Sequence, residues 1–369
     1  MTYAVTVWRA IMGAMHENQL IQPLLAGPLD IVGDIHGELG ALQDLLGQLG
    51  YSSSGGHRQG RHLVFVGDLC DRGQDSPGVI AFVQRLMDRR LAQCLLGNHE
   101  LSVLRGAHKE GNGWFYEPDH DHAEGKFLES RPADAASRQG ISDFFAGLPL
   151  VLERADLRLV HAGWDAAAIA KLRAERAGIA EVYRRFAHRA NGLVHDSGLA
   201  DRGAQEYESW KFQIKNPAAN VPLLTSYAKV DEIFQMENPI RVVTSGAESL
   251  AGTPFFASGK WRMLERVKWW NSYYDETPVI VGHYWRWPTT AARNRYSRGE
   301  HDLFDGAAPH DWHGARRNVF CVDFGVGARY KERGEGRSAP FETRLGAVRW
   351  PERELVFDDG GRWELSGGV

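Results

Sequence analysis

The sequence predicts an α/β protein, and three observations lead to this fold class. Short apolar segments that end in glycine or a polar residue recur along the 369-residue chain. Helical patterns separate the first of these segments, and alternation of strand and helix is typical of layered α/β domains with right-handed crossovers. Hydrophobic residues make up 43% and charged residues 24%, an ordinary balance for a globular protein. We expect the α/β pattern to hold over about the first 160 residues.

Six segments rich in Val, Ile and Leu have the length and the bounding turn residues of buried strands. They are Leu29–Gly33, Leu63–Gly67, Gln93–Gly97, Leu157–His161, Val279–Gly282 and Val319–Val322. Two C-terminal segments, Thr343–Trp350 and Glu354–Phe357, resemble strands of a closing antiparallel edge. The sequence therefore predicts strands at both ends of the chain.

Helices are predicted between the first strands because apolar residues repeat there at helical spacing. The leucines of Glu38–Leu49 share one face, and Val79–Arg89 repeats the pattern. From about residue 165 a further helix is predicted up to about Ala190, followed by an aromatic segment without a strong strand signal. No repeat or Pro/Ser linker marks a boundary, so we expect one domain over residues 1–369, with an elaboration at about 165–277.

Charge, cysteine content and hydropathy exclude several classes of protein. The formal net charge of −4 gives no general attraction for nucleic acid, so strong nucleic-acid binding is not expected. Three widely spaced cysteines indicate neither a disulfide framework nor a structural zinc site. The N-terminus does not resemble an export signal, and no apolar run approaches the ~18–20 residues of a membrane helix. We expect a soluble, cytoplasmic protein with no membrane partner; the oligomeric state is not indicated.

Polar side chains follow five of the predicted strands, mostly next to glycine. The segments are Gly33–Gly37 (GDIHG), Gly67–Gly73 (GDLCDRG), Gly97–Glu100 (GNHE), His161–Gly163 (HAG) and Gly282–Tyr284 (GHY). In open α/β sheets, ligands bind where the carboxyl ends of the strands converge. Glycine lets the backbone turn sharply and approach closely at such points. We therefore expect these side chains to share one site.

The side chains at these strand ends have the chemistry of metal ligands. The candidates are Asp34, His36, Asp68, Asn98, His161 and His283. Carboxylate, imidazole and amide oxygen together suit divalent ions such as Mn²⁺, Fe or Zn²⁺. Six ligands are too many for one catalytic ion that keeps an open position, and about right for two ions ~3.5–4 Å apart. Asp68 is central in sequence, and a carboxylate is able to bridge two ions.

These motifs resemble the phosphoprotein phosphatase branch of the calcineurin-like metallophosphoesterases, whose pattern reads GDxHG, GDxxDRG, GNHE and then two separated histidines. The resemblance covers residues 29–105 continuously and returns at His161 and at 283–325. It implies a sandwich of two mixed β-sheets flanked by helices. It also implies two divalent metal ions, with Mn²⁺ favoured over Fe or Zn²⁺, and phosphoester hydrolysis by a metal-bound hydroxide.

The resemblance also implies a role for each matching residue. The ligands implied for the first ion are Asp34, His36 and Asp68, and those for the second are Asp68, Asn98, His161 and His283. Arg72 would grip phosphate oxygens through its planar guanidinium. His99 would protonate the leaving oxygen, with Asp71 orienting its imidazole. The candidates for a second phosphate-binding arginine are Arg262, Arg266 and Arg286.

The sequence leaves the substrate open between phosphorylated protein and nucleotide. The first hypothesis is a phosphomonoesterase of the Ser/Thr protein phosphatase type. The second is a nucleoside polyphosphate hydrolase similar to the bacterial symmetrical bis(5'-nucleosyl)-tetraphosphatases, whose short histidine motif is like His161–Gly163. A third, a non-catalytic metal-binding scaffold, is ranked last because Asp71, Arg72 and His99 are all present.

Three further features have two interpretations each. Trp261, Trp269, Trp270, Trp285 and Trp287 would either stack on a nucleobase or pack as core, and core is favoured. Arg286, Arg293, Arg295 and Arg298 would either face a phosphorylated substrate or form a solvated loop. Asp119–His122 is interpreted as a hydrated loop and not as an extra metal site.

Overall fold

The computed structural model describes residues 18–116, 126–127, 129–304 and 306–367. The first of its two large sheets has the strand order β13-β12-β11-β2-β3-β4. Strands β2 (Leu29–Val32), β3 (His62–Phe65) and β4 (Ala92–Cys94) run parallel to one another. The antiparallel part of this sheet consists of β11 (Gly346–Trp350), β12 (Glu354–Phe357) and β13 (Arg362–Glu364). The predicted antiparallel C-terminal edge is confirmed.

The second large sheet has the order β1-β5-β6-β9-β10. Its strands are β1 (Ile21–Pro23), β5 (Val151–Arg154), β6 (Leu157–Val160), β9 (Val279–Val281) and β10 (Val319–Cys321). Only β5 and β6 pair antiparallel. The predicted mixed sandwich is confirmed, and each of the six predicted strand segments contains a strand or most of one.

A buried apolar layer joins the two sheets. Ile31 of β2 and Val64 of β3 belong to the same cluster as Leu159, Ile280 and Phe320 of the second sheet. Each of these five side chains is inaccessible to solvent. This layer fixes the sheets against each other, so the loops at their strand ends are held in constant relative positions.

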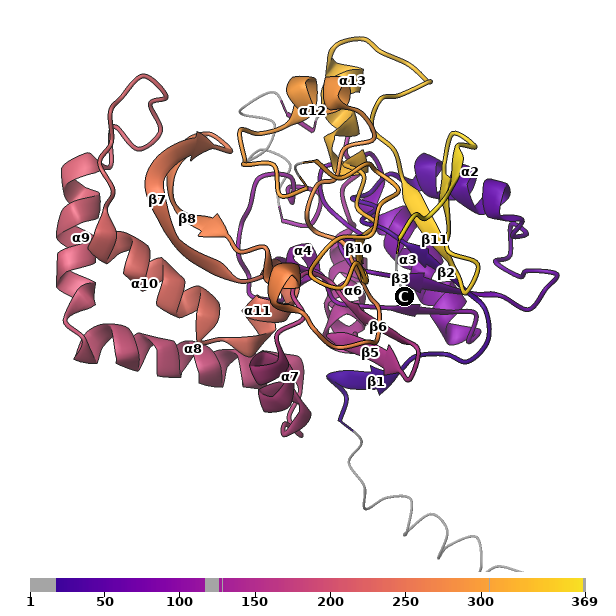
Figure 1. The fold of residues 1–369 in the computed structure, drawn as a ribbon, viewed down its shortest axis with the longest axis horizontal. Coiled ribbons are helices and arrows are strands. Elements are labelled where there is room, and N and C mark those ends of the chain that lie inside the picture. The colour runs from indigo at the N-terminus through magenta and orange to yellow at the C-terminus, as the bar shows by residue number, and fades with distance from the viewer. Residues whose placement is uncertain (1–17, 117–125, 128, 305, 368–369) are drawn as a thin grey trace, which may run out of the picture.

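Helices cover the outer side of the sandwich (Figure 1). Helix α2 (Leu39–Leu49) buries its predicted leucine face, and α3 (Ser76–Asp88) begins where the Asp75 carboxylate accepts the N–H of Gly78 at 2.8 Å. This is an ordinary N-cap. Helices α4 (Asn98–Leu104) and α6 (Ala135–Ala146) pack together beside the strand ends. The two helices predicted over Glu38–Leu49 and Val79–Arg89 are confirmed as α2 and α3.

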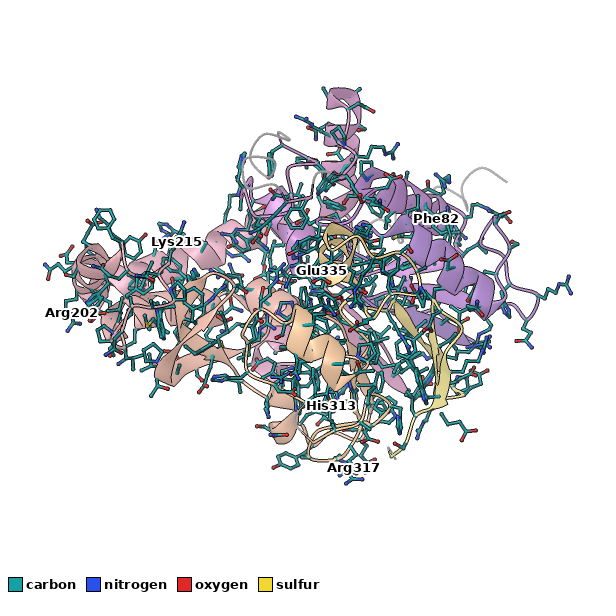
Figure 2. All side chains as sticks on the ribbon, turned by 90° about the horizontal axis from the view of Figure 1, so that it is seen from above. Phe82, Arg202, Lys215, His313, Arg317 and Glu335 are labelled. Carbon is teal, nitrogen blue, oxygen red and sulfur yellow. The ribbon has the colours of Figure 1, made fainter. Side chains whose placement is uncertain are left out.

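Residues 166–266 form a lobe beside the sandwich, visible at the left of Figure 1. Its helices are α7 (Ala166–Arg173), α8 (Ile179–Asp196), α9 (Leu199–Trp210), α10 (Thr225–Met236) and α11 (Pro239–Ser245). Its two strands, β7 (Glu248–Ala257) and β8 (Lys260–Arg266), form a separate antiparallel hairpin. Seen from above, Arg202 and Lys215 mark this lobe, and Phe82 lies on the opposite side of the molecule (Figure 2).

The hairpin was not predicted from the sequence. Its strands are half-buried on both faces, and the register shifts between Leu250 and Phe255, so the alternation of apolar and polar residues is lost. The helix predicted to run to about Ala190 is in fact two helices, α7 and α8, separated by residues 174–178. In this lobe the sequence therefore predicted helix at α7 and α8 without the break between them, and it predicted none of α9, α10, α11 and the hairpin.

The remaining elements are short. They are η1 (Trp269–Ser272), α12 (Thr290–Tyr296), η2 (Val326–Ala328) and α13 (Arg329–Gly334). Asp119–His122 lie outside the described residues. In the part of the chain that the structure covers, no helix has the length and apolar character needed to cross a bilayer.

Candidate active site

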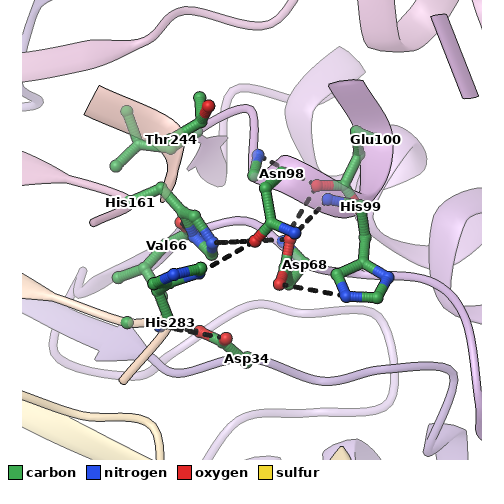
Figure 3. A network of polar contacts seen from close by, with 12 residues as sticks. Asp34, Val66, Asp68, Asn98, His99, Glu100, His161, Thr244 and His283 are labelled. Carbon is green, nitrogen blue, oxygen red and sulfur yellow. Dashed lines mark hydrogen bonds and ion pairs between the residues drawn. The ribbon is translucent and has the colours of Figure 1, made fainter. Parts of the chain in front are cut away.

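Loops that follow five strands bring the six predicted metal ligands together, and Figure 3 labels five of them, all but His36. Asp34 and His36 follow β2, Asp68 follows β3, and Asn98 begins α4 directly after β4. The other two, His161 and His283, follow β6 and β9. The first two loops are tied by the backbone N–H of His36, which donates to the carbonyl of Asp68 at 2.9 Å. The convergence expected from the sequence is present, and the six roles as ligands stay a prediction.

Backbone strain is concentrated in these loops. His36, Asp68, Asp71, Arg72 and His283 all have positive φ, from 49° to 74°. Such conformations cost of the order of 1–3 kcal/mol each in non-glycine residues and cluster at functional sites. The packing also requires glycine nearby, because a Cβ on Gly97 would lie 2.2 Å from an oxygen of Asp68. The fold therefore holds these side chains in positions that an unstrained loop would not adopt.

Asp68 lies between two groups of possible ligands. Its Oδ2 is 3.8 Å from Nε2 of His36, and its Oδ1 is 3.4 Å from Nε2 of His161. Ligand atoms of Asp68, His161 and His283 lie within 4.8 Å of one another. The Asn98 amide completes this second group, at 3.3 Å from His161 Nε2 and 2.9 Å from His283 Nδ1 (Figure 3). One carboxylate facing two ligand groups is the arrangement that a bridging ligand requires.

The tautomers of two histidines suit metal binding. Nδ1 of His36 lies 3.0 Å from the carbonyl of Cys70, and Nδ1 of His161 lies 2.8 Å from that of Val66. A carbonyl oxygen only accepts, so both Nδ1 atoms carry a proton, and both Nε2 atoms face the carboxylates, where they would bind a metal ion. Metal-binding histidines are usually oriented by such a bond from the other ring nitrogen. Nε2 of His283 is buried without a hydrogen-bond partner among the described residues, which also fits a ligand.

The charges of the cluster favour bound cations. Burial, together with the charges of Asp323 and Asp68, raises the pKa of Asp34 well above its usual range. Burial raises the pKa of Asp323 to about 6. Burial and the charge of Arg72 lower the pKa of His36 to about 3, so its imidazole is neutral. Burial opposes the charged form of His161, but the charge of Asp68 and the hydrogen bonds of the ring together outweigh burial and raise the pKa of His161. The cluster thus concentrates buried negative charge among imidazoles, a donor set that divalent metal ions stabilise. The residues therefore fit the metal pair that the motifs imply.

Arg72, His99 and Asp71 form a second chain of contacts beside the ligands. Nη1 of Arg72 lies 2.9 Å from His36 Nε2, and its Nη2 lies 3.0 Å from His99 Nε2. A guanidinium only donates, so His99 carries its proton on Nδ1, which donates to the Asp71 carboxylate. The other oxygen of Asp71 accepts the indole N–H of Trp114 at 2.6 Å. Burial raises the pKa of Asp71 to about 7 and lowers that of His99. The contact between His99 and Asp71 that the resemblance implies is present, and the catalytic roles of the two residues stay a prediction.

Three residues of the site were missed in the sequence. The Glu100 carboxylate accepts the backbone N–H of Asp68 at 2.9 Å and of Leu69 at 2.8 Å, so it holds the loop that carries Asp68. Its signal was its place in the GNHE motif, beside Asn98 and His99. Lys109 and Trp114 come from a loop without a recognisable pattern, and only the fold shows that Lys109 Nζ reaches the Asn98 carbonyl at 3.3 Å.

A cleft of about 980 Å³ opens over the metal-ligand cluster. The side of the cleft that does not carry the metal ligands is called the cleft wall. It consists of those residues of β7–β8 and of 285–300 that line the cleft. Of the three candidate arginines, Arg262 and Arg266 line this cleft. Arg286 does not: it is 2% exposed, lies over the rings of Phe304 and Phe320, and donates to the carbonyl of Asp311 at 2.7 Å. The fold places Arg286 in a structural position.

The tryptophans divide between core and cleft. Trp269 and Trp270 are buried in the main core. Trp261, Trp285 and Trp287 are half-buried and line the cleft. The core interpretation is confirmed for Trp269 and Trp270, and stacking of the other three on a nucleobase stays a prediction.

Comparison with known proteins assigns the class of the domain. Residues 27–177 match the family described as calcineurin-like phosphoesterases, and this segment contains five of the six predicted ligands. The chain therefore carries a calcineurin-like metallophosphoesterase domain.

Among curated proteins, the chain is similar to bacterial enzymes named bis(5'-nucleosyl)-tetraphosphatase PrpE [asymmetrical]. It is 47% identical to that of Oceanobacillus iheyensis over 74 residues, 19% of this chain and 30% of the relative. It is 34% identical to that of Bacillus velezensis over 149 residues, 38% of this chain and 59% of the relative. The chain thus spans between about a third and three-fifths of these relatives, whose names specify the asymmetrical type.

A solved structure, the cold-active protein-tyrosine phosphatase of a Shewanella species, aligns with a TM-score of 0.49 at 16% identity. The alignment covers 95% of this chain and 84% of the Shewanella protein.

Proposed function

We propose that the protein is a two-metal-dependent phosphohydrolase whose substrates are nucleotides that carry several phosphates in a row. The observation that carries this proposal is the cleft, which joins the metal-ligand cluster to a wall rich in arginine and aromatic side chains. Arginine binds phosphate oxygens through two parallel hydrogen bonds, and aromatic rings stack on nucleobases. The names of the curated relatives support the same substrate class.

The six predicted ligands hold the metal pair in this proposal, with Asp68 as the shared ligand. A bound pair of divalent ions supplies Lewis acidity and a nucleophile at neutral pH. We retain Mn²⁺ as the favoured ion, with Fe or Zn²⁺ as alternatives, because the ligands mix carboxylates, imidazoles and an amide. The strained loops fix the ligand geometry before substrate arrives.

The remaining side chains act directly on the substrate. The fork of Arg72, which now bonds two histidine nitrogens, turns to phosphate oxygens when substrate enters. This leaves Nε2 of His99 free to face the leaving oxygen. Once Nε2 has taken up a proton from solvent, His99 donates that proton to the leaving oxygen, while the Asp71 carboxylate holds the ring through Nδ1 and supports its charged form. We assign the second phosphate grip to Arg266, because it lines the cleft and its guanidinium carbon lies 5.5 Å from the centre of the Tyr284 ring, next in sequence to the predicted ligand His283.

Dephosphorylation of phosphoserine or phosphothreonine proteins is the competing hypothesis. The experiment measures hydrolysis of diadenosine tetraphosphate and of a phosphothreonine peptide by the Mn²⁺-loaded protein. We expect a kcat/KM at least about 100-fold higher for the dinucleotide, since the cleft wall contacts only a substrate with further phosphates and a base. A preference for the peptide would contradict the substrate proposed here and support a protein phosphatase.

We also propose that residues 166–266 are an elaboration of one catalytic domain, because the lobe supplies part of the wall of the same cleft. A cytoplasmic location is retained as well, since Cys70, Cys94 and Cys321 are free and buried.

A further inference from the structure

A second arginine, Arg298, contacts the same indole ring as Arg72. The guanidinium carbon of Arg72 is 5.2 Å from the centre of the Trp285 ring, and that of Arg298 is 4.9 Å from it. Both arginines line the cleft. After burial, the charge of Arg298 is the next largest cause of the lowered pKa of Arg72. Two guanidinium groups that contact one indole therefore line the same cleft, and their like charges repel each other.

The guanidinium of Arg298 has no anionic partner among the described residues. Its Nη2 is buried and makes no hydrogen bond within the described part of the chain. The carboxylate of Glu300, two residues away, accepts instead the backbone N–H of Arg298 at 3.1 Å and the hydroxyl of Ser258 at 2.7 Å. The carboxylate of Glu110, which also feels the charge of Arg298, is bonded to Lys126 at 2.8 Å. A buried cationic donor without a partner is costly unless an anion binds it.

The lobe holds Arg298 in place through its backbone. The N–H of Ser258, in the turn of the β7–β8 hairpin, donates to the carbonyl of Arg298 at 2.8 Å. The next residue, Gly299, has a φ of +88°, and a Cβ there would lie 2.6 Å from the carbonyl oxygen of Phe256. Only glycine allows the segment to lie this close to the hairpin. The position of Arg298 is therefore built by the fold, unlike that of a side chain on a free loop.

We propose that Arg298 is a specificity-determining residue that binds a second phosphate of the substrate, next to the phosphate held by Arg72 and the metal ligands. This inference rests on the proposed function and adds to it: the site would distinguish substrates with adjacent phosphates from simple phosphomonoesters. Trp285 keeps the two guanidinium groups in place through cation–π contacts, so both are oriented before the anion binds.

The test is a binding measurement that does not depend on turnover. Dissociation constants of AMP and of the non-hydrolysable α,β-methylene-ADP are measured by calorimetry for the Mn²⁺-loaded protein and for Arg298→Gln. We expect the substitution to weaken α,β-methylene-ADP binding about 10- to 100-fold, as lost charge-assisted hydrogen bonds do, and AMP binding less than about 3-fold. Arg298→Lys keeps the charge but not the planar fork. We therefore expect its dissociation constant for α,β-methylene-ADP to lie between those of the unaltered protein and Arg298→Gln.

A matched control is Arg295→Gln, which removes the same charge three residues away. Arg295 is ion-paired with Glu335 at 3.1 Å and does not line the cleft, so both dissociation constants stay unchanged. Equal weakening of both nucleotides by Arg298→Gln, no weakening of either, or no nucleotide binding by the unaltered protein would overturn the inference. Failure to hydrolyse diadenosine tetraphosphate would instead count against the proposed function, so the two failures are distinguishable.

Discussion

The metal-ligand cluster and the cleft wall face the same cavity but are built differently. In the cluster, Asp34, Asp68 and His161 are buried, and each of the three has hydrogen-bond partners that fix it. The cleft wall consists mostly of half-buried side chains, from the β7–β8 hairpin and from residues 285–300, which include helix α12. The cluster rests on two packed sheets, whereas part of the wall comes from the separate lobe.

Because the two regions are built differently, we expect the cluster to carry out the reaction and the cleft wall to select the substrate. A cluster held by strained loops and buried hydrogen bonds has little freedom, and preorganisation of this kind is what bond cleavage requires. A wall made of arginines and tryptophans on a hairpin contacts the parts of a substrate that do not react. Substitutions in the cluster are therefore expected to abolish turnover, and substitutions in the wall to change which substrate is preferred.

The largest effect is expected for Asp68→Asn. The shared carboxylate loses its charge, so we expect at least one metal ion to be lost and kcat to fall by about 1,000-fold or more on every substrate. Metal content by plasma mass spectrometry and turnover of p-nitrophenyl phosphate are measured together. Retention of two ions per chain would show that Asp68 is not the bridge.

A large but substrate-dependent loss is expected for His99→Ala. Without its proton donor, the protein loses about 10²–10⁴-fold in kcat on substrates with poor leaving groups. The loss on p-nitrophenyl phosphate is much smaller, because nitrophenolate leaves without protonation. Metal content serves as the control and stays unchanged. Equal losses on both kinds of substrate would contradict the role as general acid.

How much of this site was predictable depends on how local each contact is. The ligands and His99 stand in short motifs directly after strands, so residue order and glycine spacing were sufficient to predict that they meet. Arg266 and Arg298 reach the cleft only because the β7–β8 hairpin folds back over it, and that hairpin has no alternating pattern. The contact of Lys109 with Asn98 likewise depends on the path of a loop that no periodicity describes.

Two arginines that were equal candidates in the sequence are expected to behave differently. Arg266→Gln removes a cation from the cleft wall, so we expect KM for diadenosine tetraphosphate to rise about 10-fold with an unchanged Tm. Arg286→Met removes a buried group that bonds the Asp311 carbonyl, so we expect Tm to fall by a few degrees with KM unchanged. Thermal denaturation and steady-state kinetics on both variants check the pair; the reverse pattern would mean that the two roles are exchanged.

The smallest effect is expected for Trp261→Ala. Trp261 lines the cleft from β8, where its indole N–H donates to the Asn216 carbonyl at 2.9 Å. Loss of one base-stacking surface raises KM for diadenosine tetraphosphate about 5-fold and leaves p-nitrophenyl phosphate unaffected. The comparison of KM values for the two substrates checks this. An unchanged KM for the dinucleotide would place the nucleobase elsewhere in the cleft.

The central claim is that six side chains from five strand ends hold two metal ions that share Asp68. Crystals grown with Mn²⁺ and measured near the manganese absorption edge test it most directly. The account predicts two anomalous peaks, ~3.5–4 Å apart, on either side of the Asp68 carboxylate. A single peak, or peaks that do not touch Asp68, would contradict it.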